Sequence, residues 1–323
     1  MNSISRRTFL AGSAGAAALA LTACGGSGSS DASGDKTYKI GVLQLTQHAA
    51  LDAANEGFVE ALDASGIKYT IDQQNANNDQ SACATIASKL VGDGDDLIFA
   101  IATPAAQAVA AATSDIPIVG SAITDYAASG LVADNDKPGG NLTGTSDMNP
   151  VDDQIAMLQK VLPEAKHIGM LYCTAESNSQ LQIEMAEAAC DKAGLTTERF
   201  TVSSSNEIQS VVESMVGKVD AGYSPTDNTI AAAAAQVGQI AKEGKLPFIT
   251  GEENMCMGMG ICTVSIDYKE LGKMAGEMAV KILKGEDAPA NMAVETEAGD
   301  QLKTIKNEEM AEALGIDLSV LDA

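Results

Sequence analysis

Polar groups that can bind an anion follow two apolar runs in the first half of the chain. Thr103-Pro104 comes directly after the apolar residues 97–101 and has the pattern of a helix N-cap followed by the first helical residue. Backbone N–H groups at the start of such a helix, including that of Ala105, have no partner within it and can face a carboxylate. Ser121 and Thr124 follow the next apolar run and add hydroxyl donors. The alternative role of Thr103 is ordinary helix capping. The alternative role of the Ser121 and Thr124 hydroxyls is to stabilise a turn.

Residues that can bind the opposite charge follow apolar runs in the second half. The polar candidates near the ends of these runs are Tyr172, Asn178, Ser179, Thr226, Asp227 and Asn228. Because a carboxylate that becomes buried needs a cation, and no Lys or Arg stands beside it, we predict that Asp227 binds a ligand ammonium group. Charge complementarity with a helix N-terminus is its alternative role. Glu252, after the next apolar run, is the second candidate.

His48 stands with Gln44 and Asp52 near the end of the first apolar run, and we expect all three to face a ligand. For His48 a structural role is the alternative. The only other histidine, His167, precedes a strand on the far side, so we predict no metal site and no cofactor. Three alternating methionines in residues 255–259 are expected to form a flexible apolar loop, in preference to a soft-metal site.

The elements that must position these residues alternate between strand and helix. The first half predicts strands at residues 39–43, 67–71, 97–101 and 116–120, with helices at 50–64, 81–90 and 104–112. The second half predicts helices at 151–161, 179–193, 207–216 and 227–242, with strands at 167–172, 196–202, 219–223 and 246–250. A strand at 261–266, a long helix at 267–284 and an extended pair near 293–305 end the chain.

This order predicts an α/β fold with two doubly wound, Rossmann-like lobes joined by three crossover segments. In the long C-terminal helix, Asp267 has the pattern of an N-cap and Gly285 that of a terminator. We expect residues 38–145 with 267–292 to form lobe 1, and residues 146–266 with 293–323 to form lobe 2. Two such lobes can close on a ligand between them.

The N-terminus has the pattern of an export signal, residues 1–23, followed by a flexible linker at 24–37. The Leu-Thr-Ala-Cys sequence that ends at Cys24 resembles the lipobox of bacterial lipoproteins, which implies lipidation of Cys24 and anchoring outside the cytoplasm. The pair Arg6-Arg7 resembles a twin-arginine motif, and an ordinary Sec signal is the alternative. The apolar stretch is too short and too rich in glycine to span a membrane.

Composition excludes several classes of function. The 323 residues carry a net charge of −24, which disfavours binding to nucleic acid or to anionic lipid. The chain lacks a Walker A motif, a Gly-x-Ser-x-Gly elbow in its mature part and a dinucleotide fingerprint, so we predict no enzyme activity. Five cysteines remain after Cys24; the pairs Cys256–Cys262 and Cys173–Cys190 and a fully reduced state all stay open.

Several motifs carry a resemblance to a known family. They are KIGVLQ (39–44), HAALD (48–52), ATPAAQ (102–107), IPIVGSAITD (116–125), NLTGTSD (141–147), LY (171–172), ESNS (176–179), PTDN (225–228), GE (251–252), IDY (266–268) and LG (271–272). Over residues 38–296 the chain resembles the substrate-binding lipoproteins of tryptophan and tyrosine ABC importers. The resemblance implies a type I periplasmic-binding fold, an aromatic amino acid as ligand, and an ABC permease and its ATPase as partners.

The resemblance and the charged candidates together predict a lipid-anchored receptor that binds a small zwitterion between its lobes. A non-aromatic amino acid, a nucleoside or a sugar in the same architecture is the alternative, since one fold hosts many specificities. A sugar site would more often include Trp, which this chain lacks. A surface hydrolase or a sensor partner is a further alternative, although the two histidines offer no nucleophile with a paired base.

Overall fold

The computed structural model describes residues 36–322. Expectations for the export signal, for Cys24 and for most of the linker lie outside the described residues. Within residues 36–322, no helix is long and apolar enough to cross a membrane. The same part of the chain holds no group of three or more His, Cys, Asp or Glu side chains placed to bind a metal ion.

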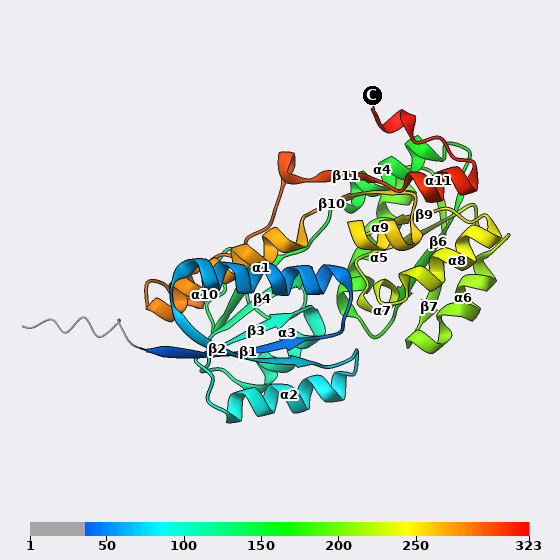
Figure 1. Cartoon of the computed structure of the whole chain (residues 1–323). Coiled ribbons are helices and arrows are strands. Elements are labelled where there is room, and N and C mark those ends of the chain that lie inside the picture. Colours follow the sequence, from blue (N-terminus) through cyan, green and yellow to red (C-terminus); the bar gives the residue numbers. More distant parts are fainter. Residues whose placement is uncertain (1–35, 323) are drawn as a thin grey trace, which may run out of the picture. The chain divides into compact units, whose positions relative to one another are not determined.

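The first lobe is built on a five-stranded parallel sheet (Figure 1). Its strands, in spatial order, are β2 (Lys68–Asn75), β1 (Thr37–Gln44), β3 (Leu97–Ile101), β4 (Ile118–Ile123) and β5 (Leu142–Ser146). Its helices are α1 (Ala49–Ser65), α2 (Gln80–Gly92), α3 (Thr103–Ala112) and α10 (Tyr268–Lys284). Helices α1 and α10 lie together on one face of the sheet, and α2 packs with α3. Apolar strands buried on both faces are typical of such a parallel sheet.

The second lobe has a six-stranded sheet in which only the β10–β11 pair is antiparallel. In spatial order the strands are β11 (Lys303–Lys306), β10 (Cys262–Ser265), β9 (Phe248–Thr250), β8 (Ala221–Ser224), β6 (His167–Cys173) and β7 (Thr196–Val202). Its helices are α4 (Val151–Val161), α5 (Ser177–Lys192), α6 (Ile208–Met215), α7 (Asn228–Ala231), α8 (Ala234–Gly244), α9 (Glu253–Met259) and α11 (Glu308–Leu314). This order confirms the predicted alternation of strands and helices.

The chain passes between the lobes three times, as the sequence predicts. It leaves the first sheet after β5, returns from β10 to α10, and leaves again after α10 to add β11 to the second sheet. On this last passage Glu295 forms a parallel bridge with Thr145 of β5. The passages therefore lie side by side where the lobes meet.

The core of the first lobe depends on a close approach of α1 and α10. Phe58 on α1 stacks on Phe99 of β3, with ring centroids 3.8 Å apart. Gly57 and Gly272 stand where the two helices meet, and a Cβ atom at Gly272 would lie 1.9 Å from the carbonyl oxygen of Ala54. The two helix backbones are therefore so close that only glycine fits at these positions. The predicted caps of α10 are confirmed, because Asp267 accepts hydrogen bonds from two backbone N–H groups and Gly285 has a φ of 72°.

Some local expectations were wrong. Residues 253–259 form helix α9 and not a flexible loop, because the Glu252 side chain accepts the N–H groups of Asn254 and Met255 at its start. The helix expected at 227–242 is divided into α7 and α8, and helix α11 has no counterpart in the sequence analysis. Thr103 is already helical, since Ala102 with a φ of 84° takes the N-cap position of α3.

The five cysteines of the described residues are buried and unpaired; they are Cys83, Cys173, Cys190, Cys256 and Cys262. Burial is the largest effect on the thiol of each one and raises its pKa. They therefore pack as small apolar side chains in the structure.

Candidate ligand-binding site

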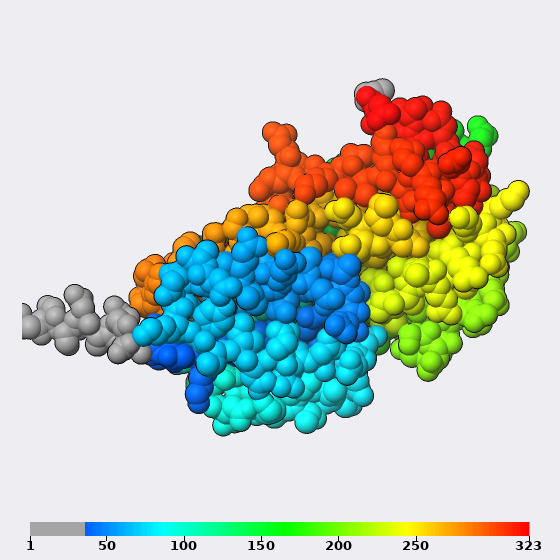
Figure 2. Space-filling view, in the orientation of Figure 1, coloured from blue at the N-terminus to red at the C-terminus, as the bar shows by residue number. Residues whose placement is uncertain are grey.

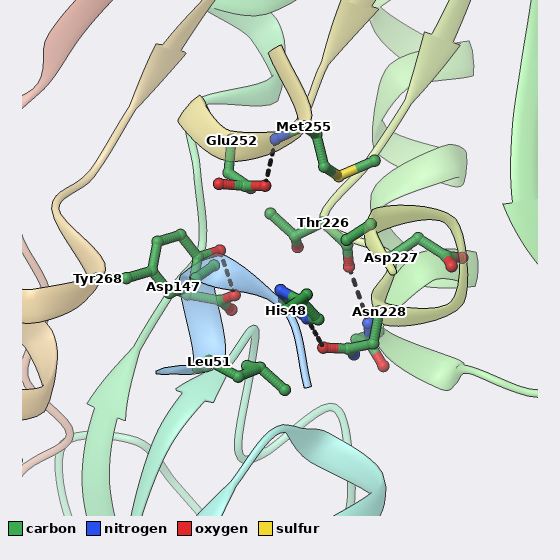
Figure 3. A pocket seen from close by; sticks show the side chains of 13 residues that line it. His48, Leu51, Asp147, Thr226, Asp227, Asn228, Glu252, Met255 and Tyr268 are labelled. Carbon is green, nitrogen blue, oxygen red and sulfur yellow. Dashed lines mark hydrogen bonds between the residues drawn. The ribbon is translucent and has the colours of Figure 1, made fainter. Parts of the chain in front are cut away.

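A cavity with about 280 Å³ of empty space lies between the two lobes (Figure 3). Its wall includes side chains from the N-terminal end of α1, from the ends of β4 and β8, from α7 and α9, and from two of the passages between lobes. The lining residues are His48, Ala50, Leu51, Ala122, Asp147, Asn178, Thr226, Asp227, Asn228, Ala231, Glu252, Met255 and Tyr268.

The polar lining residues follow the carboxyl ends of parallel strands. His48 comes after β1, Asn178 after β6, Thr226 after β8 and Glu252 after β9. Strands of one sheet that run in the same direction end at the same edge, so these residues meet although they are far apart in sequence. The two sheets face each other across this edge, and the cavity lies between them.

Glu176 organises the second lobe beside the cavity. It is buried and accepts four hydrogen bonds, from the backbone and side-chain groups of Asn228 and Thr229, at 2.6–3.1 Å. A buried carboxylate with this many donors is well compensated for the loss of water. Glu176 thereby fixes the start of α7, on which Asn228 stands.

Asp227 and Glu252 line the cavity, and each of their carboxylates also caps a helix. Asp227 accepts from the N–H of Ile230 at 2.9 Å and from the N–H of Cys173 at 2.6 Å. Glu252 accepts from the N–H of Met255 and from that of Asn254, both at 2.6 Å. Burial raises the pKa of Glu252 to about 7. Burial, and then the negative charge of Glu176, raise the pKa of Asp227.

Asp147 and Tyr268 come from two different passages between the lobes. The Tyr268 hydroxyl donates to Oδ2 of Asp147 at 2.7 Å, and the two side chains lie together at one side of the cavity (Figure 3). Burial raises the pKa of Asp147 to about 6, although hydrogen bonds from Tyr268 and Thr124 act in the opposite direction. The other oxygen of Asp147, Oδ1, is buried and has no hydrogen-bond partner.

His48 is joined to Glu176 through Asn228. Because Nδ2 of Asn228 donates to Glu176, its Oδ1 faces Nε2 of His48 at 3.1 Å, and Nε2 must carry the proton. Burial is the largest effect on His48 and lowers its pKa, so the imidazole is neutral near pH 7. Its Nδ1 atom is then an acceptor, and it is buried without a partner.

Six of the residues predicted from the sequence lie together in the cavity wall: His48, Asn178, Thr226, Asp227, Asn228 and Glu252. The others lie outside it. Gln44 donates to Asp52 at 2.7 Å and to the carbonyl of Thr46 at 2.8 Å. Thr103 and Ala105 are buried in the first turn of α3.

Four more predicted residues stand behind the cavity wall or away from it. Ser121 accepts a hydrogen bond from the Thr145 hydroxyl at 3.0 Å. Thr124 contacts Asp147, and Ser179 contacts Asp227. Tyr172 faces the guanidinium of Arg199, which lies 5.9 Å from the ring centroid. The structure thus places Thr124 and Ser179 next to lining residues and Tyr172 against a surface side chain.

Seven lining residues were not predicted from the sequence: Ala50, Leu51, Ala122, Asp147, Ala231, Met255 and Tyr268. The small and apolar ones carry no chemical signal in a sequence. Asp147 and Tyr268 belong to motifs that were noted, NLTGTSD and IDY, but neither follows an expected strand–helix unit of one lobe. Their role becomes visible only when the passages between lobes are seen to form part of the cavity wall.

Comparison with known proteins identifies the family. Residues 39–320 match the family model described as ABC transporter substrate binding protein. The chain belongs to this family. Its members are non-enzymatic binding components of ABC transporters, and the two-lobed fold of this substrate-binding protein is that of type I periplasmic binding proteins.

The substrate-binding protein has relatives with named ligands. A tyrosine-binding protein from Clostridioides difficile is 38% identical to it over 323 residues, which cover 91% of this chain and 94% of that protein. The crystal structure of an ABC domain in complex with L-Trp from Streptococcus pneumoniae is 42% identical, with a TM-score of 0.85 over 89% of this chain and 98% of that one.

The arrangement of the two lobes resembles that of the L-Trp complex. A ligand-free, open structure of a substrate-binding protein with adhesive properties from Clostridium difficile is equally similar in sequence, at 43% identity over 87% of this chain and 95% of that one. Its TM-score is only 0.66. Hydrogen bonds that join the lobes agree with a closed form, among them Asn78 to Thr229 at 2.9 Å and His48 to Asn228 at 3.1 Å.

Asn78→Gly tests the contribution of one such hydrogen bond to closure. Glycine keeps the positive φ of 62° at this position and removes the amide that reaches Thr229. Because the bond forms in the closed state, we expect the ligand affinity to fall about 2- to 10-fold, as for the loss of one hydrogen bond. Calorimetric titration measures the change.

Asn77→Gly is the matched control for this variant. Asn77 also has a positive φ, and its side chain is exposed on the same turn. We expect its affinity to remain within about twofold of the wild type. Equal losses in the two variants would show that the turn, and not the contact with Thr229, determines affinity.

Proposed function

We propose that this substrate-binding protein binds an aromatic amino acid as a zwitterion in the cavity between its lobes and delivers it to an ABC permease. The proposal rests on two facts together: the ligands named for similar proteins, and the side chains that line the cavity. Proteins 38% and 42% identical over most of the chain are described with tyrosine and with L-Trp. The cavity offers buried carboxylates for an ammonium group and apolar side chains, including Leu51 and Met255, for a ring.

The proposal includes the location of the protein. The lipobox-like sequence at Cys24 supports a lipid anchor, and the tether that follows would hold the binding lobes close to the permease. Six predicted residues, His48, Asn178, Thr226, Asp227, Asn228 and Glu252, are proposed to contact the ligand because they line the cavity. Gln44, Asp52, Thr103, Ala105, Ser121, Thr124, Tyr172 and Ser179 are proposed to support these residues or to act during opening.

A thermal-shift screen of the purified protein tests the ligand class. Ligands that bind only the folded state raise the melting temperature by mass action, and a concentration of 100 Kd stabilises by about 2.7 kcal/mol. We expect L-Trp, L-Tyr or L-Phe at that level to raise Tm by roughly 5 °C. A shift with a nucleoside or a sugar, and none with any amino acid, would contradict the proposal.

A further inference from the structure

Three acceptor atoms in the cavity wall are buried and have no partner. They are Nδ1 of His48, Oδ1 of Asp147 and Oδ1 of Asn178. Buried polar atoms are nearly always hydrogen-bonded, and one that is not indicates a missing partner. All three atoms accept hydrogen bonds, since His48 carries its proton on Nε2 and the amide nitrogen of Asn178 already donates to the carbonyl of Thr226 at 3.0 Å. The group that completes them must therefore donate.

The buried carboxylates near the cavity differ in how completely they are satisfied. Both oxygens of Glu176, Asp227 and Glu252 accept hydrogen bonds from backbone N–H groups of this chain. Asp147 accepts from Tyr268 on Oδ2 and has Thr124 beside it, but its Oδ1 is buried without a hydrogen-bond partner. With 4% of its surface exposed, it is also shielded from solvent.

No side chain in the cavity wall supplies a positive charge to balance the carboxylate of Asp147. The lining residues include no Lys or Arg, and the one histidine among them is neutral near pH 7. A buried carboxylate is stabilised by a cation that also donates hydrogen bonds. Such a cation must come from the ligand.

We propose that Asp147 is the residue that receives the ammonium group of the ligand, and that Tyr268 positions it. His48 and Asn178 accept from the remaining donors of the ligand. This inference rests on the proposed function, because it assumes an amino-acid ligand. It differs from the prediction made from the sequence, which gave the ammonium group to Asp227. In Figure 3, Asp147 and Asp227 lie on different sides of the cavity, so the two assignments orient the ligand differently.

Calorimetric titration with matched ligands separates the two assignments. The ligands are L-tryptophan and indole-3-propionate, which lacks only the amino group; L-tyrosine and its deamino analogue replace them if the wild type prefers tyrosine. We expect the wild type to bind the amino acid about 100-fold more tightly than the analogue, as for a buried charge pair. In Asp147→Asn this preference should fall below about tenfold, since the amide has the same shape but no charge.

Two further variants act as references. Asp227→Asn is expected to weaken both ligands alike and to keep the preference for the amino acid, because Asp227 holds backbone N–H groups of Ile230 and Cys173. Asp153→Asn changes an exposed carboxylate on α4 and should leave both titrations unchanged. The melting temperature without ligand shows that each variant folds.

The outcomes separate this inference from the proposed function. If the wild type binds neither aromatic amino acid, the proposed function and the inference are both wrong. If the wild type binds one of them and Asp147→Asn keeps the full preference, only the inference is overturned. Loss of the preference in Asp227→Asn, with its retention in Asp147→Asn, would assign the ammonium group to Asp227.

Discussion

Gly272→Ala is expected to lower the free energy of unfolding by about 3 kcal/mol and the melting temperature by roughly 6–10 °C. The added Cβ atom would lie 1.9 Å from the carbonyl oxygen of Ala54, on the backbone of α1. The same close contact occurs in the other direction, because a Cβ atom at Gly57 would lie 2.0 Å from the carbonyl oxygen of Lys269. A small local shift of either helix therefore cannot make room for the added atom. The helices must therefore separate and uncover part of the core. Urea unfolding followed by circular dichroism measures the loss.

Gly92→Ala makes the same chemical change in a place with free space. Gly92 is the last residue of α2, has no positive φ, and no atom lies within 4 Å of its ideal Cβ position. We expect its free energy of unfolding to stay within about 0.5 kcal/mol of the wild type. If both variants unfolded alike, the close approach of α1 and α10 would not be what limits residue size at position 272.

Ligand affinity is expected to fall about tenfold for each pH unit below about 6. Burial raises the pKa of Asp147 to about 6 in the ligand-free protein. A bound ammonium group favours the charged carboxylate, so it lowers the pKa of Asp147 in the complex. Below pH 6 the ligand must displace a proton in order to bind, and above it the affinity should be constant. Titrations between about pH 5 and pH 7.5 cover this window, in which the ligand's own groups keep their charge.

Other titratable groups near Asp147 have to be distinguished from it. Tyr268 hydrogen-bonds it, Glu176 adds negative charge, and Tyr126 also interacts with it. Glu252, with a pKa raised to about 7 by burial, and Asp227, with a pKa raised by burial and by the charge of Glu176, also line the cavity, but the ammonium group is proposed to contact Asp147 and not these two. Only a group whose pKa changes on binding makes the affinity depend on pH. Asp147→Asn should therefore show a flat profile over this window, and a slope equal to that of the wild type would assign the effect to another group.

Much of the fold follows from patterns within single elements. An apolar run that forms a strand is a signal within one short segment. The caps Asp267 and Gly285 likewise belong to the single helix that they begin and end. Such signals can be recognised in the sequence without knowledge of tertiary contacts. Helix α9 was missed because alternating methionines and glycines have no helical stripe. Its start depends on the side chain of Glu252, which caps it.

The candidate site could be predicted only in part, for a related reason. Polar residues after strands, such as His48 and Asn228, are visible in the sequence because parallel strands end at one edge. Their contact across 180 residues depends on how the lobes meet. Asp147 is a similar case, since its partner Tyr268 is supplied by another passage between the lobes. Which carboxylate lacks a partner is a property of three-dimensional packing and not of a motif.

Helix α10 and the third passage between the lobes, which follows it, also determine when each lobe can finish folding during synthesis. Helix α10 covers α1, shown in orange and blue in Figure 2, and β11 then closes the edge of the second sheet beside β10. Both hydrophobic cores are therefore complete only after the same C-terminal stretch has been synthesised, although α1 is synthesised early. Until that stretch emerges, the face of α1 with Ala54, Gly57 and Ala61 stays uncovered and open to chaperones. A chain that stops before residue 268 would leave both lobes unfinished, so the fold distinguishes complete chains from truncated ones.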